Sequence, residues 1–171
     1  MKTNILHRLI LLAACVAALA ALVPAQNKKE VLTLKTFGAA RVGMTVAEAS
    51  KALGVRLVTN DANEECRYYE AKTGFKDIAF MTSNDRIVRF DIRKRGYATD
   101  RGVRVGDTEA RVRRLYRGLY KVEKHHYIDG HYITITTKDG KFGLVFETDG
   151  RRVISINAGR APEYGYIEGC S

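Results

Sequence analysis

The sequence predicts an α+β protein made of two tandem α-β-β-β units, with both helices packed on one face of a continuous antiparallel sheet. Three short stretches recur in the same order: residues 41–47 (RVGMTVA), 78–82 (IAFMT) and 86–88 (RIV) match residues 104–110 (RVGDTEA), 144–148 (LVFET) and 152–154 (RVI). The units cover about residues 36–95 and 100–158, and no linker rich in proline or serine separates them. We therefore expect a single domain.

The chain begins with the pattern of a secretory signal peptide, which we place at residues 1–25. Lys2 and Arg8 precede an apolar run over residues 9–23, which is shorter than the roughly 18 residues of a spanning helix. Small residues in Val23-Pro24-Ala25 then suit a signal-peptidase cut. The folded part, residues 26–171, is therefore expected in the periplasm or outside the cell.

A competing interpretation lies inside this leader. Leu12-Ala13-Ala14-Cys15 matches the lipobox at which bacterial lipoproteins are cut and acylated, and lipidation of Cys15 would anchor the protein to a membrane. The run stays apolar beyond Cys15, which favours an ordinary residue of the signal peptide.

Each unit opens with a helix. Thr45 and Glu48 form a T-x-x-E capping box, Gly54 ends the first helix, and Thr108 caps the second. Apolar residues recur at helical spacing in both units: Val46, Ala49, Ala52 and Leu53, then Val112, Leu115, Tyr116 and Leu119.

Strands follow each helix and pair as hairpins. In the first unit the β-prone stretches are residues 66–71, 78–82 and 87–92, and in the second they are residues 132–136, 142–148 and 153–157. Asp149-Gly150 is a strong hairpin turn. Residues 31–36 are expected to add an edge strand.

Two cysteines remain outside the leader, Cys66 and Cys170. Because exported proteins usually oxidise such a pair, we expect a disulfide that ties the C-terminal tail to the domain. A catalytic thiol is the alternative, but nothing near either cysteine resembles an activated nucleophile.

A Val-Gly-Met-Thr stretch, a short helix ending in Ala-Leu-Gly, then a strand and a hairpin resemble the β-lactamase-inhibitor-protein-like superfamily and the SmpA/OmlA outer-membrane lipoproteins. The resemblance covers roughly residues 36–160. It implies tandem copies of one unit, as in the inhibitor protein, and an exported binding or scaffolding module.

Candidate chemistry is sparse in the sequence. His125, His126 and His131 lie close together near Asp129 and could bind zinc, but Asp129-Gly130 is typical of a turn, so surface histidines are the expected interpretation. G-x-S-x-G and P-loop motifs are missing. We expect no catalytic residues, no metal site and no cofactor, and keep a small secreted hydrolase as an alternative.

The charge indicates the kind of partner. The chain has 29 Lys and Arg against 19 Asp and Glu, a net charge of +10. Export separates it from nucleic acid, so an anionic component of the cell envelope or an acidic protein is the expected partner. A basic surface without a dedicated ligand is the alternative.

Strand alternation predicts where a partner docks. If the apolar side chains lie under the helices, the polar ones form an open sheet face. The candidate binding residues on that face are Tyr68, Arg89, Asp91, Arg93, Tyr132, Thr134, Ser155 and Asn157. Tyrosine among adaptable polar groups suits protein recognition, and an open sheet face that is merely solvated is the alternative interpretation. The predicted function is an exported, non-enzymatic, inhibitor-like binding module; the first alternative is an envelope-assembly or structural lipoprotein.

Overall fold

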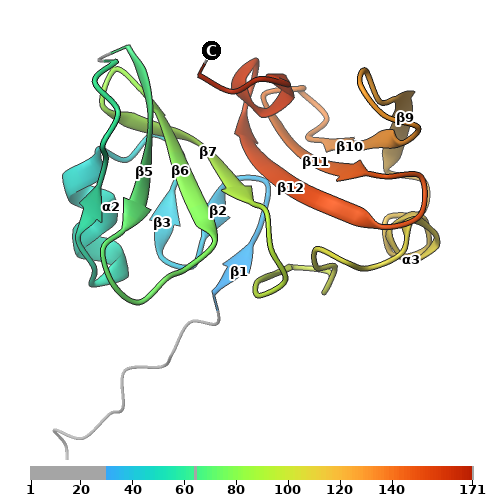
Figure 1. The fold of residues 1–171 in the computed structure, drawn as a ribbon, viewed down its shortest axis with the longest axis horizontal. Coiled ribbons are helices and arrows are strands. Elements are labelled where there is room, and N and C mark those ends of the chain that lie inside the picture. The colour runs from blue at the N-terminus through green and yellow to red at the C-terminus, as the bar shows by residue number, and fades with distance from the viewer. Residues whose placement is uncertain (1–29, 64, 171) are drawn as a thin grey trace, which may run out of the picture.

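The computed structural model describes residues 30–63 and 65–170, so the predicted signal peptide and Cys15 lie outside the described residues. An eight-stranded sheet dominates the molecule, in the order β4-β5-β6-β7-β12-β11-β10-β9 (Figure 1). Every neighbouring pair in this sheet is antiparallel. Its strands are β4 (Leu57–Val58), β5 (Cys66–Ala71), β6 (Ile78–Ser83), β7 (Arg86–Ile92), β9 (Tyr120–Lys124), β10 (His131–Thr136), β11 (Phe142–Thr148) and β12 (Val153–Arg160).

The predicted fold class, with helices packed on one continuous sheet, is wrong. The regular secondary structure of the described chain is mostly strand, and a second sheet has four short strands in the order β3-β2-β1-β8. These strands are β1 (Val31–Leu32), β2 (Thr36–Phe37), β3 (Ala40–Arg41) and β8 (Ala98–Thr99). The two α-helices are short, α2 (Val46–Leu53) and α3 (Glu109–Leu115), and a 3-10 turn, η2 (Glu163–Gly165), follows near the C-terminus. None of the described helices is long and apolar enough to cross a membrane.

The helices are too short to form a layer over the whole sheet. With 8 and 7 residues, α2 and α3 are too short to cover eight strands, and the small sheet fills part of the second layer. Phe37 of β2 lies edge-on to Phe80 of the large sheet, with 6.0 Å between ring centroids. In the second half Tyr116, which follows α3, packs on Phe146 at 5.4 Å.

The helix starts follow the capping residues that the sequence indicates. Thr45 accepts from the Glu48 backbone N–H at 3.2 Å, and the Glu48 carboxylate accepts from the Thr45 N–H at 2.8 Å. This capping box is therefore confirmed. Gly54 ends α2 with a φ of 69°, a left-handed conformation that glycine adopts without strain.

Corresponding residues of the two halves make corresponding contacts. Arg86 donates to the Gly43 carbonyl at 2.9 Å, and Arg152 donates to the Gly106 carbonyl at 2.8 Å. Each hairpin also has a register shift at the corresponding position of its first strand. The shift lies between Met81 and Thr82 in β6 and between residues 147 and 148 in β11. These pairs support the repeat interpretation, which stays a prediction.

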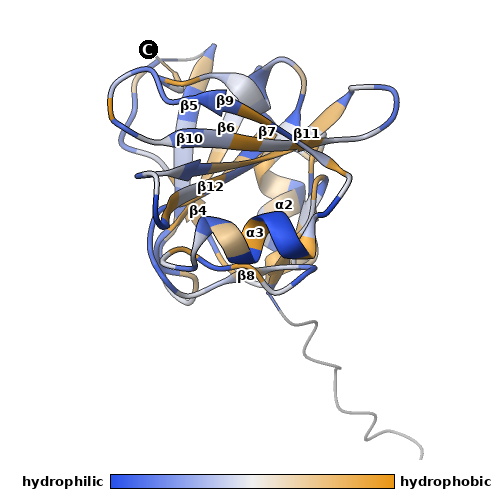
Figure 2. Ribbon diagram, turned by 90° about the vertical axis from the view of Figure 1, so that its right-hand side faces the viewer, coloured by the Kyte–Doolittle hydropathy of each residue, from blue (hydrophilic) through white to orange (hydrophobic). Residues whose placement is uncertain are grey.

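The large sheet has one apolar and one polar face. The apolar face buries the core, including Phe80, Phe90, Phe146 and Ile156, against α2, α3 and the small sheet. In the side view, α3 and β8 lie below the strands of the large sheet, whereas the C-terminus lies above them (Figure 2). The C-terminal segment, residues 161–170, contacts the polar face through η2, which packs on β7, β11 and β12.

Candidate functional site

The eight predicted binding residues share the polar face of the large sheet. The side chains of directly paired residues on neighbouring strands point to the same side of a sheet. One row of such pairs crosses four strands: Asp91 pairs with Asn157, Asn157 with Val145, and Val145 with Thr134. Tyr68, Arg89, Tyr132 and Ser155 lie in neighbouring rows, and Arg93 continues the alternation past the end of β7. The face that alternation indicates is thus a real surface of the sheet.

Arg89 and Asp91 are not open to solvent, so the expected exposure of these two residues is wrong. Their side chains are only 2% and 1% exposed, and Arg89 Nε lies 2.6 Å from Asp91 Oδ1. Arg89 also donates to the carbonyls of Glu163 at 2.9 Å and Tyr166 at 2.7 Å, and to the Tyr68 hydroxyl at 2.7 Å. With a further bond to Asp91 Oδ2 at 2.8 Å, all five N–H donors of the guanidinium have an acceptor.

Electrostatics around this pair follow from burial. Burial first, and then the negative charge of Asp91, raise the pKa of Tyr68 to about 12. The hydroxyl therefore stays neutral at physiological pH. The Arg89–Asp91 pair holds the C-terminal segment on the sheet and is a structural element of the site.

The C-terminal segment forms a fixed wall on the polar face. The Cys66–Cys170 disulfide is confirmed and ties the end of the segment to β5. At its start, Arg160 Nη2 lies 2.7 Å from Glu163 Oε1. The ring of Tyr164 lies against Gly143 of β11, where a Cβ atom would come within 2.6 Å of Tyr164 Cδ2. Glycine at position 143 therefore allows this close approach.

A cavity of about 360 Å³ opens between this wall and strands β9 to β12. Three predicted residues line it, Tyr132, Thr134 and Asn157. Among the described residues, the side chains of Thr134 and Asn157 have no hydrogen-bond partner, so a hydroxyl and an amide are free for a ligand. The other lining residues are Lys121, Glu123, His126, Thr136, Val145, Glu147, Tyr164, Gly165, Tyr166 and Ile167.

Much of this lining lies outside the residues that strand alternation and residue type predict. Glu147 continues the alternation of β11, so the same pattern that indicates Tyr132 could have identified it. Tyr164, Tyr166 and Ile167 reach the site only because the tail folds back over the sheet. No local pattern in residues 161–170 indicates that path.

The remaining predicted residues line neighbouring hollows of the same face. Arg89, Arg93 and Ser155 border a cavity of about 260 Å³ beside Ile167, which they share with Asn157. Tyr68, Asp91 and Arg93 border one of about 400 Å³ in the first half. Asp91 contributes little there, because both of its carboxylate oxygens bind Arg89.

Glu147 joins a histidine and a serine at the floor of the main cavity. His125 Nε2 lies 2.7 Å from Glu147 Oε1, and the Ser155 hydroxyl donates to Glu147 Oε2 at 2.5 Å. His125 Nδ1 accepts from the backbone N–H of Tyr127 at 3.0 Å, so Nε2 is the nitrogen that carries the proton. The His125 ring also stacks on Tyr132, with 4.5 Å between centroids. This cluster therefore orients Tyr132.

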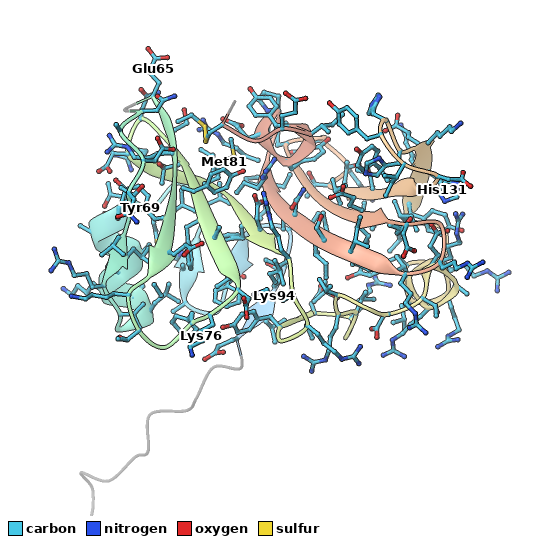
Figure 3. All side chains as sticks on the ribbon, in the orientation of Figure 1. Glu65, Tyr69, Lys76, Met81, Lys94 and His131 are labelled. Carbon is cyan, nitrogen blue, oxygen red and sulfur yellow. A yellow bond between two sulfur atoms is a disulfide. The ribbon has the colours of Figure 1, made fainter. Side chains whose placement is uncertain are left out.

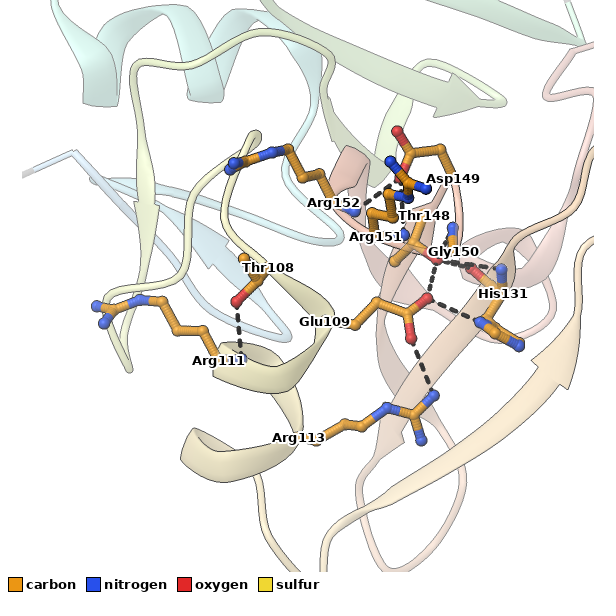
Figure 4. Close-up of polar contacts among 10 residues, drawn as sticks. All are labelled: Thr108, Glu109, Arg111, Arg113, His131, Thr148, Asp149, Gly150, Arg151 and Arg152. Atoms are coloured by element: carbon orange, nitrogen blue, oxygen red, sulfur yellow. Dashed lines mark hydrogen bonds and ion pairs between the residues drawn. The ribbon is translucent and has the colours of Figure 1, made fainter.

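A second carboxylate, the buried Glu109, has a similar arrangement at the start of α3 (Figure 4). Glu109 accepts from His131 Nδ1 at 2.8 Å, from Arg113 Nη2 at 3.0 Å and from the Thr148 hydroxyl. Burial alone would raise the pKa of Glu109, but the hydrogen bonds from Thr148, His131 and Arg113 outweigh it and lower the pKa.

These two clusters are unlike the arrangement that activates a nucleophile. In each, the carboxylate is central and accepts from both the histidine and the hydroxyl, so the histidine does not face the hydroxyl oxygen as a general base must. His125 and His131 are bound to different carboxylates. No group of three or more His, Cys, Asp or Glu suited to a metal ion occurs within residues 30–63 and 65–170.

Comparisons with known proteins give little beyond this geometry. No protein-family model matches the sequence, and no curated protein matches it. Among solved structures, the chain is similar to the uncharacterized protein YfeY from Escherichia coli, with 14% identity and a TM-score of 0.48 over 76% of this chain and 99% of that one. A likeness at this level is too weak to transfer a function.

Proposed function

We propose that the chain is an exported, non-enzymatic binding module that takes a loop of a partner protein into the cavity between β9–β12 and the C-terminal segment. One observation carries the proposal: an open cavity on a sheet face presents the unpaired side chains of Thr134 and Asn157 beside an oriented Tyr132. Its volume of about 360 Å³ is at the lower end of ligand sites and suits one or two side chains.

The rim of the cavity favours a protein as the partner. Tyr166 and Ile167 are 41% and 47% exposed, and Tyr127 is 67% exposed close by, held by a hydrogen bond from its hydroxyl to Glu168 at 2.5 Å. Exposed aromatic and aliphatic side chains around a polar hollow are typical of protein recognition. Lys121 is outnumbered by Glu123 and Glu147 in the lining, so nothing in this cavity favours an anion.

Fixed walls support binding without reorganisation. Arg89 and the disulfide hold the C-terminal segment in place, and a preorganised surface loses less conformational entropy when it binds. The disulfide also supports export, because thiols stay reduced in the cytosol. Anchoring through a lipidated Cys15 remains the alternative, and the mass of the mature N-terminus separates a free Gln26 from an acylated Cys15.

Site-specific crosslinking tests the proposal. We expect a photo-reactive residue at Tyr166 to capture a partner protein from a cell-envelope extract, whereas the same residue at Lys51, on α2 and away from the polar face, captures none. Asn157→Ala should reduce that capture at least about tenfold while the urea midpoint stays unchanged, because the Asn157 side chain supports no other residue. Equal capture from both positions, or full capture by Asn157→Ala, would contradict the proposal.

A further inference from the structure

A second surface lies at the outer end of the second half, where the end of α3 leads into β9. β9 is an edge strand of the large sheet. This end is on the right in Figure 1 and faces the viewer in Figure 2. We call it the basic edge and define it by five exposed residues: Arg114, Arg117, Leu119, Val122 and Lys124.

The cations of the basic edge are free. Arg114, Arg117 and Lys124 form no ion pair with any described residue, although two arginines just before them do. Arg111 Nε lies 3.2 Å from Asp107 Oδ2, and Arg113 Nη2 lies 3.0 Å from Glu109 Oε2. Side-chain nitrogen atoms are seen along the right-hand end of the molecule in the side-chain view (Figure 3). The surface therefore carries three uncompensated positive charges.

The acidic residue of β9 is directed elsewhere. Side chains alternate along a strand, so Val122 and Lys124 lie on one side and Glu123 on the other. Glu123 is paired in register with Tyr132 and lines the cavity of the polar face. It does not neutralise the basic edge.

Two apolar side chains lie among these cations. Leu119 is 50% exposed and Val122 is 36% exposed. Val122 pairs with Ile133, whose side chain is fully buried, but β9 has no further strand beside it to cover the outer side chain. Leu119 and Val122 are therefore partly exposed apolar side chains that arginine and lysine flank along the chain.

We propose that the basic edge docks on the surface of an anionic lipid bilayer. The three cations meet lipid headgroups, and Leu119 and Val122 enter the boundary between headgroups and acyl chains, as the apolar side chains of peripheral proteins do. A soluble polyanion would use the charges but would leave both apolar side chains in water. Each cation near an anionic membrane contributes about 1 kcal/mol, or about fivefold in affinity. This role is separate from the binding cavity and does not depend on it.

Vesicle sedimentation tests the proposal on the chain from Gln26 onward, which contains every described helix and strand and lacks the apolar leader. Vesicles of phosphatidylglycerol mixed with phosphatidylcholine should bind the protein, and vesicles of phosphatidylcholine alone should not. Arg114→Glu/Arg117→Glu should weaken binding at least about 25-fold. Arg56→Glu/Lys72→Glu, two exposed cations of the first half, makes the same change in net charge and should retain most of the affinity.

The apolar residues separate a bilayer from other anionic partners. Leu119→Ser/Val122→Ser should weaken vesicle binding at least about fivefold and leave retention on a sulfated-polysaccharide column unchanged. Circular dichroism and thermal melting of each variant check that it is folded. The proposal is wrong if the wild type ignores anionic vesicles, if both charge variants lose the same affinity, or if Leu119→Ser/Val122→Ser binds like the wild type.

Discussion

The guanidinium of Arg89 and the carboxylate of Asp91 form a buried ion pair two residues apart on β7, with 2.6 Å between Nε and Oδ1. The same guanidinium binds the main-chain carbonyls of Glu163 and Tyr166. One side chain of the first half thereby holds the wall of a cavity in the second.

Asp91→Ala is expected to lower the free energy of unfolding by about 3–5 kcal/mol, because it leaves the Arg89 charge buried without its partner. Urea denaturation measures the change. Arg93→Ala, an exposed cation on the same strand face, is the matched control and should stay within about 0.5 kcal/mol of the wild type. Equal midpoints for the two variants would show that the pair does not stabilise the fold.

Removing the disulfide is expected to destabilise the protein and loosen the wall. Cys66→Ser/Cys170→Ser opens a loop whose ends are 104 residues apart, for which chain entropy gives about 4–5 kcal/mol. Denaturation with and without a reducing agent measures the loss. The reductant should lower the denaturation midpoint of the wild type toward that of the double variant and leave the midpoint of the variant unchanged. A wild-type midpoint that the reductant does not move would contradict this account.

Gly143→Ala should displace the Tyr164 ring, because the added Cβ would lie 2.6 Å from Tyr164 Cδ2. We expect a loss of about 1–3 kcal/mol, the usual range for overpacking. Gly165→Ala is the control, since nothing lies within 4 Å of its Cβ position. Thermal unfolding compares the two, and a Gly143→Ala midpoint at or above that of Gly165→Ala would refute the close approach.

The Glu109 cluster should make stability depend on pH. The pKa of Glu109 is lowered below its ordinary value of 4.5 in the folded state, so its stabilising effect is present above pH 4.5 and is lost as the pH falls through the folded pKa. Glu109→Gln should therefore be less stable than the wild type at pH 7, and the gap should narrow below pH 4.5. Unfolding curves from pH 3 to pH 7 measure this difference in stability between the wild type and Glu109→Gln.

The exposed carboxylate variant Glu70→Gln is the control for removing one negative charge. A gap between the wild type and Glu109→Gln that stays constant over this pH range would mean that packing, and not ionisation of the carboxylate, accounts for the loss.

Strand alternation predicts the polar face well because side chains of a strand reach opposite faces whatever lies above them. Thus Tyr132, Thr134 and Asn157 do line the cavity. Whether a side chain on that face is buried cannot be predicted in this way, since burial depends on segments that are distant in the sequence. Nothing near Arg89 in the sequence indicates that residues 161–170 cover it, although the paired cysteines predict the tether that brings them there.

The same distinction explains the error in the fold class. The starts of α2 and α3 can be predicted because the capping residues lie next to the helices in the sequence. The small sheet is built from strands of two residues, and β1 joins β8 by parallel pairing of Val31 with Ala98 and Leu32 with Thr99. Strands this short carry no detectable period, so their pairing is a tertiary effect.

The disulfide also determines how mechanical force would enter the molecule. A pull applied beyond Cys170 passes through the sulfur bridge into Cys66 and hence into β5, in the half of the chain that is synthesised first. The backbone between η2 and Cys170 bears load only together with that bridge. Tension on this end is therefore shared between β5, at the far side of the first half, and the segment that covers the polar face.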